Sequence, residues 1–276
     1  MPPGLRLEEA LAALDGVVVA FSGGVDSALL AHAALDVLGP DRVLAVTAAS
    51  GSLATGELDH CRDLARAWGL PWLSLATAEL DRPEYVANAG DRCFWCKDAL
   101  MDVLQPLADD RDATIVLGVN LDDLGDHRPG QDAARGRGAR FPLVDAALSK
   151  AEVRQLARGR DLPVWDRPAT PCLSSRIPYG TPVTVSVLSQ VDRAEAVVRS
   201  AGFGDVRVRH HGDTARVEVP RSDLGRIVER ADELVDALTA LGYRYVTLDL
   251  AGLRSGNLNQ ALAGQPPRHD GTTGLR

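Results

Sequence analysis

The chain has 276 residues, 45% of them apolar, which is enough for one large domain or two smaller ones with a real core. Its net charge of −8 argues against a dedicated nucleic-acid binder, because such proteins normally present a basic surface. No apolar run reaches the ~20 residues of a membrane span, residues 1–14 lack the apolar core of a signal peptide, and four cysteines are too few for a disulfide scaffold. We therefore expect a cytoplasmic protein whose cysteines are kept for chemistry.

Strand and helix patterns alternate through the first two-thirds of the chain. Apolar runs predict strands at residues 17–21, 42–47 and 114–118, with a shorter apolar run at 71–75. Helical spacing predicts helices at residues 28–37, 55–68, 97–107 and 149–158, the last with Ser149 as N-cap and Glu152 completing a capping box. This alternation predicts an α/β fold with a parallel sheet and helices on both faces, in which ligands bind at the carboxyl ends of the strands.

A glycine-rich loop joins the first predicted strand to the first predicted helix. Its residues are Ser22, Gly23, Gly24, Val25, Asp26 and Ser27. Loop amides and a helix N-terminus together make an anion site, and the glycines let the backbone approach a phosphate closely. The pattern SGGxDS resembles the pyrophosphate (PP) loop of ATP pyrophosphatases, and it lacks the lysine of a Walker A loop. The alternative is a tight turn in which Ser22 caps the helix and Ser27 lies just inside it.

The last third of the chain differs in composition. Five prolines crowd residues 163–182, where a long regular element is not expected. Helical patterns follow at residues 185–200 and 222–238, and strand patterns at 206–209, 215–219 and 243–250. We predict a PP-loop domain at residues 1–165, a proline-rich connector at 166–182, an α+β domain for substrate binding and oligomerisation at 183–255, and a disordered tail at 256–276.

Three of the four cysteines lie in informative contexts. Cys93 and Cys96 form a CxxC pair, and Cys172 lies in the proline-rich connector with Arg176 four residues later, where a cation favours a thiolate. A CxxC pair alone fits half a zinc site, a metal-free dithiol or part of an iron–sulfur site. Three cysteines fit an iron–sulfur cluster with one open iron. Cys61, inside a helical pattern, is expected to be a small buried apolar residue.

Several segments together resemble one family. They are SGGVDS at residues 22–27, RCFWCK at 92–97, GVNLDDLGDHRPG at 118–130, FPL at 141–143, WDRPATPCLSSRIPYG at 165–180 and YVTLDL at 245–250. The family is the LarE type of ATP-dependent sacrificial sulfur transferase, which acts in synthesis of the nickel-pincer nucleotide cofactor. It belongs to the PP-loop superfamily, with a fold like that of the adenine nucleotide alpha hydrolases.

The resemblance implies a reaction. ATP with Mg²⁺ adenylates a carboxylate of pyridinium-3,5-biscarboxylic acid mononucleotide, and sulfur then displaces AMP to give a thiocarboxylate. In one branch of the family the sulfur comes from the cysteine matched by Cys172, which becomes dehydroalanine. In the other branch three cysteines hold a 4Fe-4S cluster that delivers sulfide without sacrifice. Because Cys93, Cys96 and Cys172 are all present, the resemblance implies the cluster branch.

The resemblance also implies roles around the nucleotide. Asp26 is a candidate to position Mg²⁺, with stabilisation of the helix terminus as the alternative. Asp126 and Trp95 match positions near the catalytic pocket. Trp95 can stack on the pyridinium ring or act as an apolar plug beside the cysteines. Arg128, followed by Gly130, is a candidate phosphate ligand or a solvated loop arginine.

A second group of residues is expected to hold the substrate phosphate. Arg207 and Arg209 alternate on one predicted strand and share a face, and the resemblance places phosphate-binding arginines here with Glu195 nearby. The alternative is an ordinary solvated strand face. The family resemblance further implies a homo-oligomer such as a hexamer.

Other functions remain open at this stage. A tRNA thiolase of the same superfamily would need a basic surface, which a net charge of −8 disfavours. A synthetase using ammonia, such as NAD synthetase, would leave the three cysteines without a purpose. A non-catalytic nucleotide-binding regulator is disfavoured by the intact loop. We expect a small nucleotide substrate and sulfide or another sulfur donor as partners, with no nucleic acid and no membrane.

Overall fold

The computed structural model describes residues 1–125 and 129–254, and its chain divides into two compact units. The first unit comprises Met1–Ser174 and Pro182–Ser189, and the second comprises Ser175–Thr181 and the chain from Gln190 onward. The predicted tail at 256–276 lies outside the described residues, as do Asp126 and Arg128.

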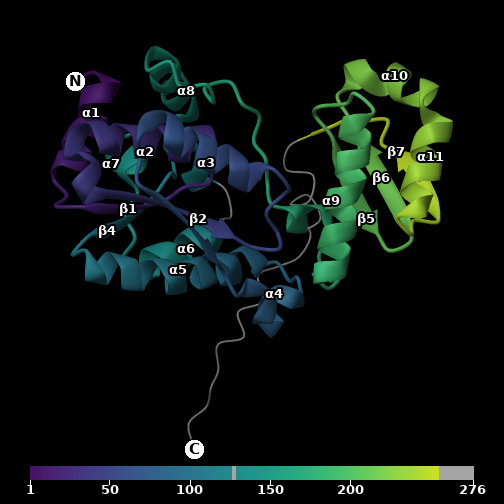
Figure 1. The fold of residues 1–276 in the computed structure, drawn as a ribbon, viewed down its shortest axis with the longest axis horizontal. Coiled ribbons are helices and arrows are strands. Elements are labelled where there is room, and N and C mark those ends of the chain that lie inside the picture. The colour runs from purple at the N-terminus through teal and green to yellow at the C-terminus, as the bar shows by residue number, and fades with distance from the viewer. Residues whose placement is uncertain (126–128, 255–276) are drawn as a thin grey trace, which may run out of the picture. The chain divides into compact units, whose positions relative to one another are not determined.

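The first unit is built on a four-stranded parallel sheet (Figure 1). Its strands are β1 (Val17–Ala20), β2 (Val43–Ala49), β3 (Trp72–Ala76) and β4 (Thr114–Leu117), in the order β3-β2-β1-β4. The strands match the predicted apolar runs, so the predicted α/β fold is confirmed. The chain steps outward from β1 to β3 and then returns to the other side of β1. This reversal makes the carboxyl ends of β1 and β4 a topological switch point, where such folds bind ligands.

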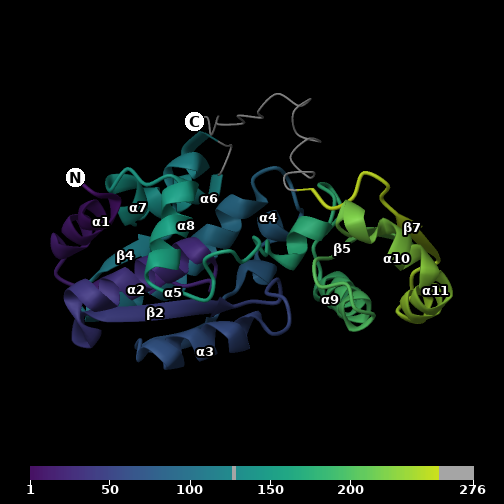
Figure 2. The same ribbon diagram turned by 90° about the horizontal axis from the view of Figure 1, so that it is seen from above.

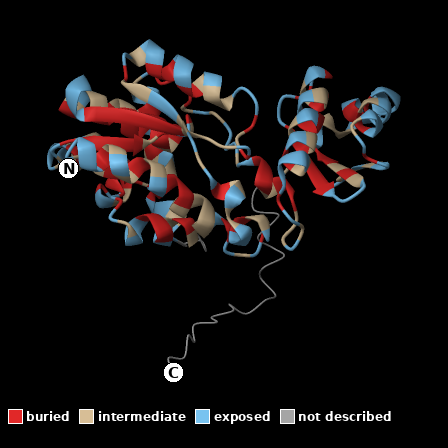
Figure 3. Ribbon diagram, turned by 60° about the horizontal axis from the view of Figure 1, so that its bottom comes forward, coloured by how far each residue is buried: buried red, intermediate tan, exposed pale blue. Residues whose placement is uncertain are grey.

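Helices cover both faces of this sheet because its strands are apolar on both sides. Val17, Val19 and Val43 pack with α1 (Pro3–Ala12), α2 (Val25–Leu38), α3 (Glu57–Trp68), α7 (Pro142–Asp145) and α8 (Lys150–Gly159). Val18 and Leu44 face the other way, toward α5 (Arg92–Asp110) and α6 (Pro129–Gly136). Figures 1 and 2 show these two layers, with α2 packed against α1 and α8. In Figure 3 the central strands are almost wholly buried, whereas the helices alternate between buried and exposed positions.

One predicted helix begins earlier than expected. The sequence places its start at Lys97, whereas α5 begins at Arg92 and carries both cysteines of the CxxC pair in its first turns. The amide of Phe94 donates to the carbonyl of Asp91 at 2.8 Å, which closes the first turn. The aromatic and cysteine residues of this turn have only modest helix propensity, so sequence spacing alone gave no helix there. The capping box at Ser149 and Glu152 is confirmed at the start of α8.

The second unit holds a three-stranded mixed sheet. Its strands are β5 (Arg207–His211), β6 (Thr214–Glu218) and β7 (Tyr245–Leu248), with β5 antiparallel and β7 parallel to β6. The hairpin between β5 and β6 turns at Gly212, whose φ of 65° favours glycine. The predicted helix at 185–200 is α9 (Val185–Ser200).

The single helix predicted at 222–238 is wrong. The structure has α10 (Leu224–Glu229) and α11 (Ala231–Ala240), which are separated at Arg230. The Arg230 guanidinium donates to Glu233 three residues later and to the carbonyl of Ala201, so one long-range bond helps to hold the break. No glycine or proline marks this position, and the periodicity therefore gave no sign of it.

Candidate functional site

The glycine-rich loop lies between β1 and α2 and is held by its own serines. The amide of Ser22 donates to the hydroxyl oxygen of Ser27 at 3.2 Å, and the two hydroxyls lie 3.1 Å apart. Ser27 Oγ donates to the carbonyl of Gly24 at 3.1 Å. Ser22 is not the N-cap, because that position is Gly24, which has no side chain to occupy the helix terminus. The first N–H groups of α2 thus point out of a rigid loop, as an anion site requires.

Two glycines allow the close approaches around this loop. Gly23 has a φ of 71°, and a Cβ there would lie 2.9 Å from Cys61 Sγ and from the ring of His60. Gly118 directly follows β4, and a Cβ there would lie 2.7 Å from the amide nitrogen of Ser27. The carboxyl end of β4 therefore packs directly against the first turn of α2, at the switch point of the sheet.

Asp26 projects from the loop into a small polar group. Its carboxylate accepts from Asn120 Nδ2 at 2.9 Å and from Lys150 Nζ at 2.5 Å. The backbone amide of Lys150 donates to Asp122. Lys150 and Asp26 are both partly exposed, so their ion pair can open to ligands. The Lys150 ammonium can then bind a phosphate, and the Asp26 carboxylate can bind a divalent cation.

Lys150 and Asn120 were missed in the sequence analysis. Lys150 directly follows the N-cap Ser149, and Asn120 follows a predicted strand, so each begins or ends an element at the ligand-binding edge. Lysine is also rare in this chain: its two lysines are Lys97 and Lys150, whereas its many other cationic side chains are arginines. This rarity could have marked Lys150 as a candidate site residue.

The cysteine segments meet at another part of the first unit. Arg92 directly precedes Cys93, and its Nη1 donates to the carbonyl of Ser174 at 2.8 Å. This bond joins the CxxC turn to the connector two residues after Cys172. Cys93 and Cys172 are exposed, whereas Cys96 is half-buried. Cys61 is fully buried and packs in the apolar core, as expected.

Buried polar side chains lie around these cysteines. Burial raises the pKa of the Cys96 thiol to about 12; Lys97 opposes that shift, and nearby Cys172, Glu79 and Cys93 add to it. Burial is also the main reason that the pKa of Tyr85 is raised. Glu79 is 1% exposed and accepts from Ser52 Oγ at 3.4 Å. None of these polar neighbours of the cysteines was predicted.

The three cysteines fit an iron–sulfur cluster in the chemistry of their donors, since clusters are held by thiolates. Among residues 1–125 and 129–254, however, no three Cys, His, Asp or Glu side chains are arranged as a ready metal site. The cysteines are neighbours, since Cys172 and Cys93 both act on the pKa of the Cys96 thiol. Trp95 lies in the same turn, with its Nε1 donating to Asp91 at 3.0 Å and its ring edge-on to Phe94.

The predicted phosphate residues lie in the second unit, and most of them are already paired. Arg209 is 5% exposed, donates through Nε and Nη2 to both oxygens of Glu218, and donates through Nη1 to the carbonyl of Ser175. Arg207 is half-buried and donates to the carbonyl of Arg254. Its pKa is lowered, first by desolvation and then by the positive charges of Arg176 and Arg209.

Arg176 and Glu195 form a second buried pair in that unit. The Arg176 guanidinium donates to the two carboxylate oxygens of Glu195 at 2.7 and 3.2 Å, and both side chains are nearly inaccessible. Glu195 also accepts from Arg199 and from the amide of Val208. Arg176 therefore has its charge matched by a carboxylate, and its predicted influence on Cys172 stays a prediction.

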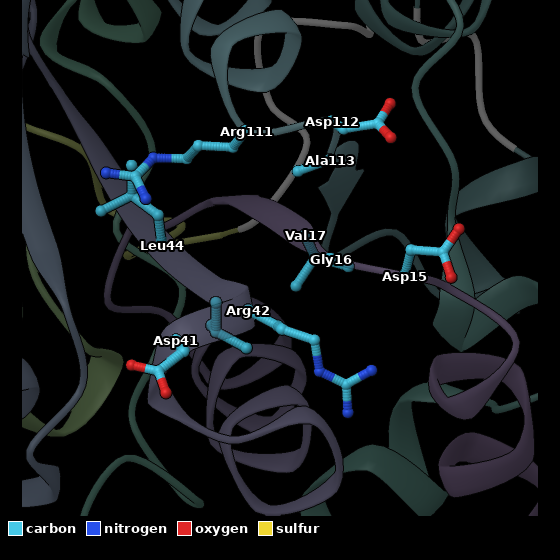
Figure 4. A pocket seen from close by; sticks show the side chains of 10 residues that line it. Asp15, Gly16, Val17, Asp41, Arg42, Leu44, Arg111, Asp112 and Ala113 are labelled. Carbon is cyan, nitrogen blue, oxygen red and sulfur yellow. The ribbon is translucent and has the colours of Figure 1, made fainter.

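A hollow of about 200 Å³ lies at the opposite, amino ends of the strands (Figure 4). It is lined by Asp15, Asp41, Arg42, Arg111 and Asp112 among others. Their charged ends spread around its rim without converging (Figure 4). It contains no predicted site residue, so we assign the functional site to the loop and cysteine regions.

Comparison with known proteins agrees with this geometry. A family model described as NAD synthase matches residues 6–82, which contain the loop. A pyridinium-3,5-bisthiocarboxylic acid mononucleotide synthase of Lactiplantibacillus plantarum is 40% identical over 257 residues, covering 93% of this chain and 93% of that protein. An uncharacterized protein of Synechocystis sp. is 46% identical over 260 residues, covering 93% and 97%. Another uncharacterized protein, of Methanocaldococcus jannaschii, is 24% identical over 240 residues, covering 87% and 91%.

The parallel sheet, its loop and the NAD synthase match define an ATP pyrophosphatase of the PP-loop superfamily. The match to NAD synthase ends at residue 82, before the CxxC pair, whereas the relative from Lactiplantibacillus extends over nearly the whole chain. The chain belongs to the LarE family of ATP-dependent, adenylating sulfur transferases. Within its described residues, every helix is too short or too polar to cross a membrane.

Proposed function

We propose that the protein converts a carboxylate of pyridinium-3,5-biscarboxylic acid mononucleotide to a thiocarboxylate, for synthesis of the nickel-pincer nucleotide cofactor. The substrate carboxylate attacks the α-phosphorus of ATP, and pyrophosphate leaves. A sulfur nucleophile then attacks the activated carbonyl carbon, and AMP leaves. The 40% identity to a synthase of the corresponding bisthiocarboxylic acid mononucleotide supports this substrate.

The first half of the reaction is assigned to the loop region. The amides of the first turn of α2 bind the phosphates, and Asp26 helps to position Mg²⁺ while Lys150 turns to the phosphates. Adenylation makes the carboxylate an electrophile with a good leaving group. The closed bonding among Ser22, Ser27 and Gly24 supports this role, because a rigid loop stabilises developing charge without reorganising.

We propose that the sulfur is delivered through a 4Fe-4S cluster held by Cys93, Cys96 and Cys172. One observation carries this assignment, the hydrogen bond from Arg92 to Ser174 that joins the two cysteine segments. Bound to three cysteines, such a cluster supplies one open iron for an exogenous sulfide. The glycine-rich loop follows β1 and the CxxC segment follows β3, while the amide of Leu173, next to Cys172, donates to the carbonyl of Ser52 in the segment after β2. These positions support a common edge of the sheet for the thiols and the nucleotide.

The second candidate is the sacrificial reaction, in which Cys172 itself gives up its sulfur. The exposure of Cys172 favours this candidate. A tRNA thiolase remains the more distant alternative, and copurifying RNA would support it. The homo-oligomeric state and the phosphate-binding role of Arg207 stay predictions.

The deciding experiment is anaerobic purification followed by absorption spectroscopy, with iron and acid-labile sulfide counted. We expect a brown protein with iron and sulfide in equal amounts. Serine at position 93, 96 or 172 should remove iron, colour and sulfur transfer together, because a site left with two thiolates does not retain the cluster. Cys61→Ser is the matched control and should change none of the three.

Turnover separates the two sulfur sources. With sulfide supplied, the cluster enzyme should turn over repeatedly, and Cys172 should keep its mass. A single turnover with loss of about one H₂S at Cys172, in protein that tolerates Cys93→Ser, would refute the cluster proposal. That outcome would leave the family assignment intact.

A further inference from the structure

The connector that carries Cys172 is fixed immediately after the cysteine. Cys172 is exposed, whereas Leu173 and Ser174 are 1% and 0% exposed. The amide of Leu173 donates to the carbonyl of Ser52 at 2.8 Å, in the segment that follows β2. An exposed thiol therefore lies beside two buried residues, and its position depends on what holds them.

Ser174 is held through both its side chain and its backbone. Its hydroxyl lies 2.6 Å from the hydroxyl of Tyr85, and its carbonyl accepts from Arg92 Nη1 at 2.8 Å. The same Nη1 donates to Asn88 Oδ1 at 2.6 Å. Tyr85 is 1% exposed and Arg92 is 3% exposed, so these bonds form away from solvent, where an unmet polar group is costly.

The short helix α4 (Pro83–Val86) contacts the connector and also the residue that follows it. Tyr85 bonds Ser174, and the carbonyl of Val86 accepts from the amide of Val183 at 2.9 Å, where the chain re-enters the first unit. Glu79 lies just upstream of this helix, and its Oε2 is buried with no hydrogen bond among the described residues. A phenylalanine at position 85 would fill the same space without a buried hydroxyl. The Tyr85 hydroxyl therefore adds no apolar burial. Its contribution is to fix the position of Ser174 through a buried hydrogen bond.

We propose that Tyr85 is a positioning residue for sulfur transfer, which fixes the Cys172 sulfur beside the CxxC pair by holding Ser174 against Arg92. The proposal rests on the proposed function only in taking these thiols as the site of sulfur delivery. Its structural content is that the Tyr85 hydroxyl contributes to holding Cys172 near the α5 cysteines, together with the bonds that Arg92 and Ser52 make to the same segment.

Chemical bridging of thiols in iron-free protein tests this proposal directly. Dibromobimane alkylates two thiols, with loss of two bromides, only when the thiols lie close together. Peptide mapping separates a bridge between Cys172 and either α5 cysteine from the bridge between Cys93 and Cys96. The second bridge lies within the first turns of α5 and serves as the internal standard.

Tyr85→Phe should lower the yield of Cys172 bridges about 2- to 10-fold relative to that standard, as loss of one hydrogen bond implies. Ser174→Ala should give a similar loss, and the double variant should add little to either. Tyr245→Phe is the matched control, because Tyr245 is an exposed tyrosine in the second unit. Circular dichroism and thermal melting check that each variant is folded.

Two outcomes would overturn the proposal. One is wild-type protein that gives no Cys172 bridge, and the other is a folded Tyr85→Phe protein that bridges like wild type. In the active enzyme, Tyr85→Phe should slow sulfur transfer by the same factor while AMP formation and the KM for ATP stay unchanged. Normal bridging in protein that transfers no sulfur would instead refute the proposed function and leave the positioning role standing.

Discussion

The loop after β1 and the arginines of β5 are two candidate anion sites of opposite design. The loop offers backbone amides, and its charged neighbours Asp26 and Lys150 are partly exposed and pair with each other, while Asn120 donates to Asp26. The Arg209 guanidinium instead donates hydrogen bonds to Glu218 and to the carbonyl of Ser175, and this side chain is nearly inaccessible to solvent. The loop is thus arranged to exchange its contacts for a ligand, whereas Arg209 is arranged to hold its own unit together.

This difference separates Arg207 from Arg209, which share a strand face and look alike in sequence. Arg207 is only half-buried, and its charge is opposed by the neighbouring arginines. An anion placed at Arg207 would relieve that repulsion. Arg207 is therefore the better candidate for the substrate phosphate, and the predicted pair of phosphate ligands becomes a proposal for one of them.

The largest expected effect is on stability, from Arg209→Ala. Removal of this guanidinium takes away the group that binds both oxygens of the buried Glu218 carboxylate. We expect a loss of about 3–5 kcal/mol in the free energy of unfolding, measured by denaturant titration. Arg207→Ala should lose no more than about 0.5 kcal/mol while raising the KM for the nucleotide substrate. A stable Arg209→Ala protein with weakened substrate binding would place Arg209 in the phosphate site. It would contradict the proposed difference in role between Arg207 and Arg209.

The next effect is on catalysis, from Asp26→Asn. The amide keeps the shape of the side chain but removes the charge that faces Lys150 and that would position Mg²⁺ in the proposed reaction. AMP formation should fall about 10²- to 10³-fold, as for loss of one preorganised electrostatic group, while the melting temperature changes little. Asp41→Asn, an exposed residue at the amino end of β2, is the control. AMP release at the wild-type rate from folded Asp26→Asn protein would contradict the role of the loop.

Lys150→Met should have a smaller effect on nucleotide binding. A charge-assisted phosphate contact contributes about 1.5–3 kcal/mol, so the KM for ATP should rise roughly 10- to 100-fold. Lys97→Met removes the other lysine of the chain, which lies beside the cysteines, and should leave the KM for ATP unchanged. Equal effects of the two variants would mean that general charge, and not the contact at Asp26, governs ATP binding.

The smallest expected effect comes from Gly118→Ala. Its Cβ would lie 2.7–2.9 Å from backbone atoms of Asp26 and Ser27, and neither the strand end nor the helix turn can move far. We expect a loss of about 1–3 kcal/mol in the free energy of unfolding, together with weaker ATP binding because the loop shifts. Gly159→Ala has open space around its Cβ and should change neither quantity. Unchanged ATP binding in Gly118→Ala would show that the loop tolerates displacement.

Local chemistry made part of the site predictable. Ser22, Gly24 and Ser27 bond one another across at most five residues, so a short motif encodes the whole loop. The capping box of α8 is encoded in the same way, by two residues three apart. The strand-to-helix alternation gave the sheet and its helices because burial on both faces demands apolar runs of this kind.

The arrangement around Cys172 could not be predicted in that way. Tyr85 and Arg92 reach Ser174 across 89 and 82 residues, and nothing in their own neighbourhoods marks them. The break at Arg230 is likewise held by a bond to Ala201 that periodicity does not encode. Arg209 bonds Glu218 on the paired strand and the carbonyl of Ser175, whereas Arg207 bonds the carbonyl of Arg254, and the strand pattern encodes neither arrangement.

The sequence by itself thus determined the α/β fold, the glycine-rich loop and the family, and it singled out three cysteines as candidates. Each of these depends on residues that are neighbours in the chain or on burial patterns that repeat along it. The tertiary structure alone decided which charged side chains are already paired and which polar groups hold Cys172 beside the CxxC turn. Those contacts join distant segments, and their partners are fixed only when the packed elements bring the segments together.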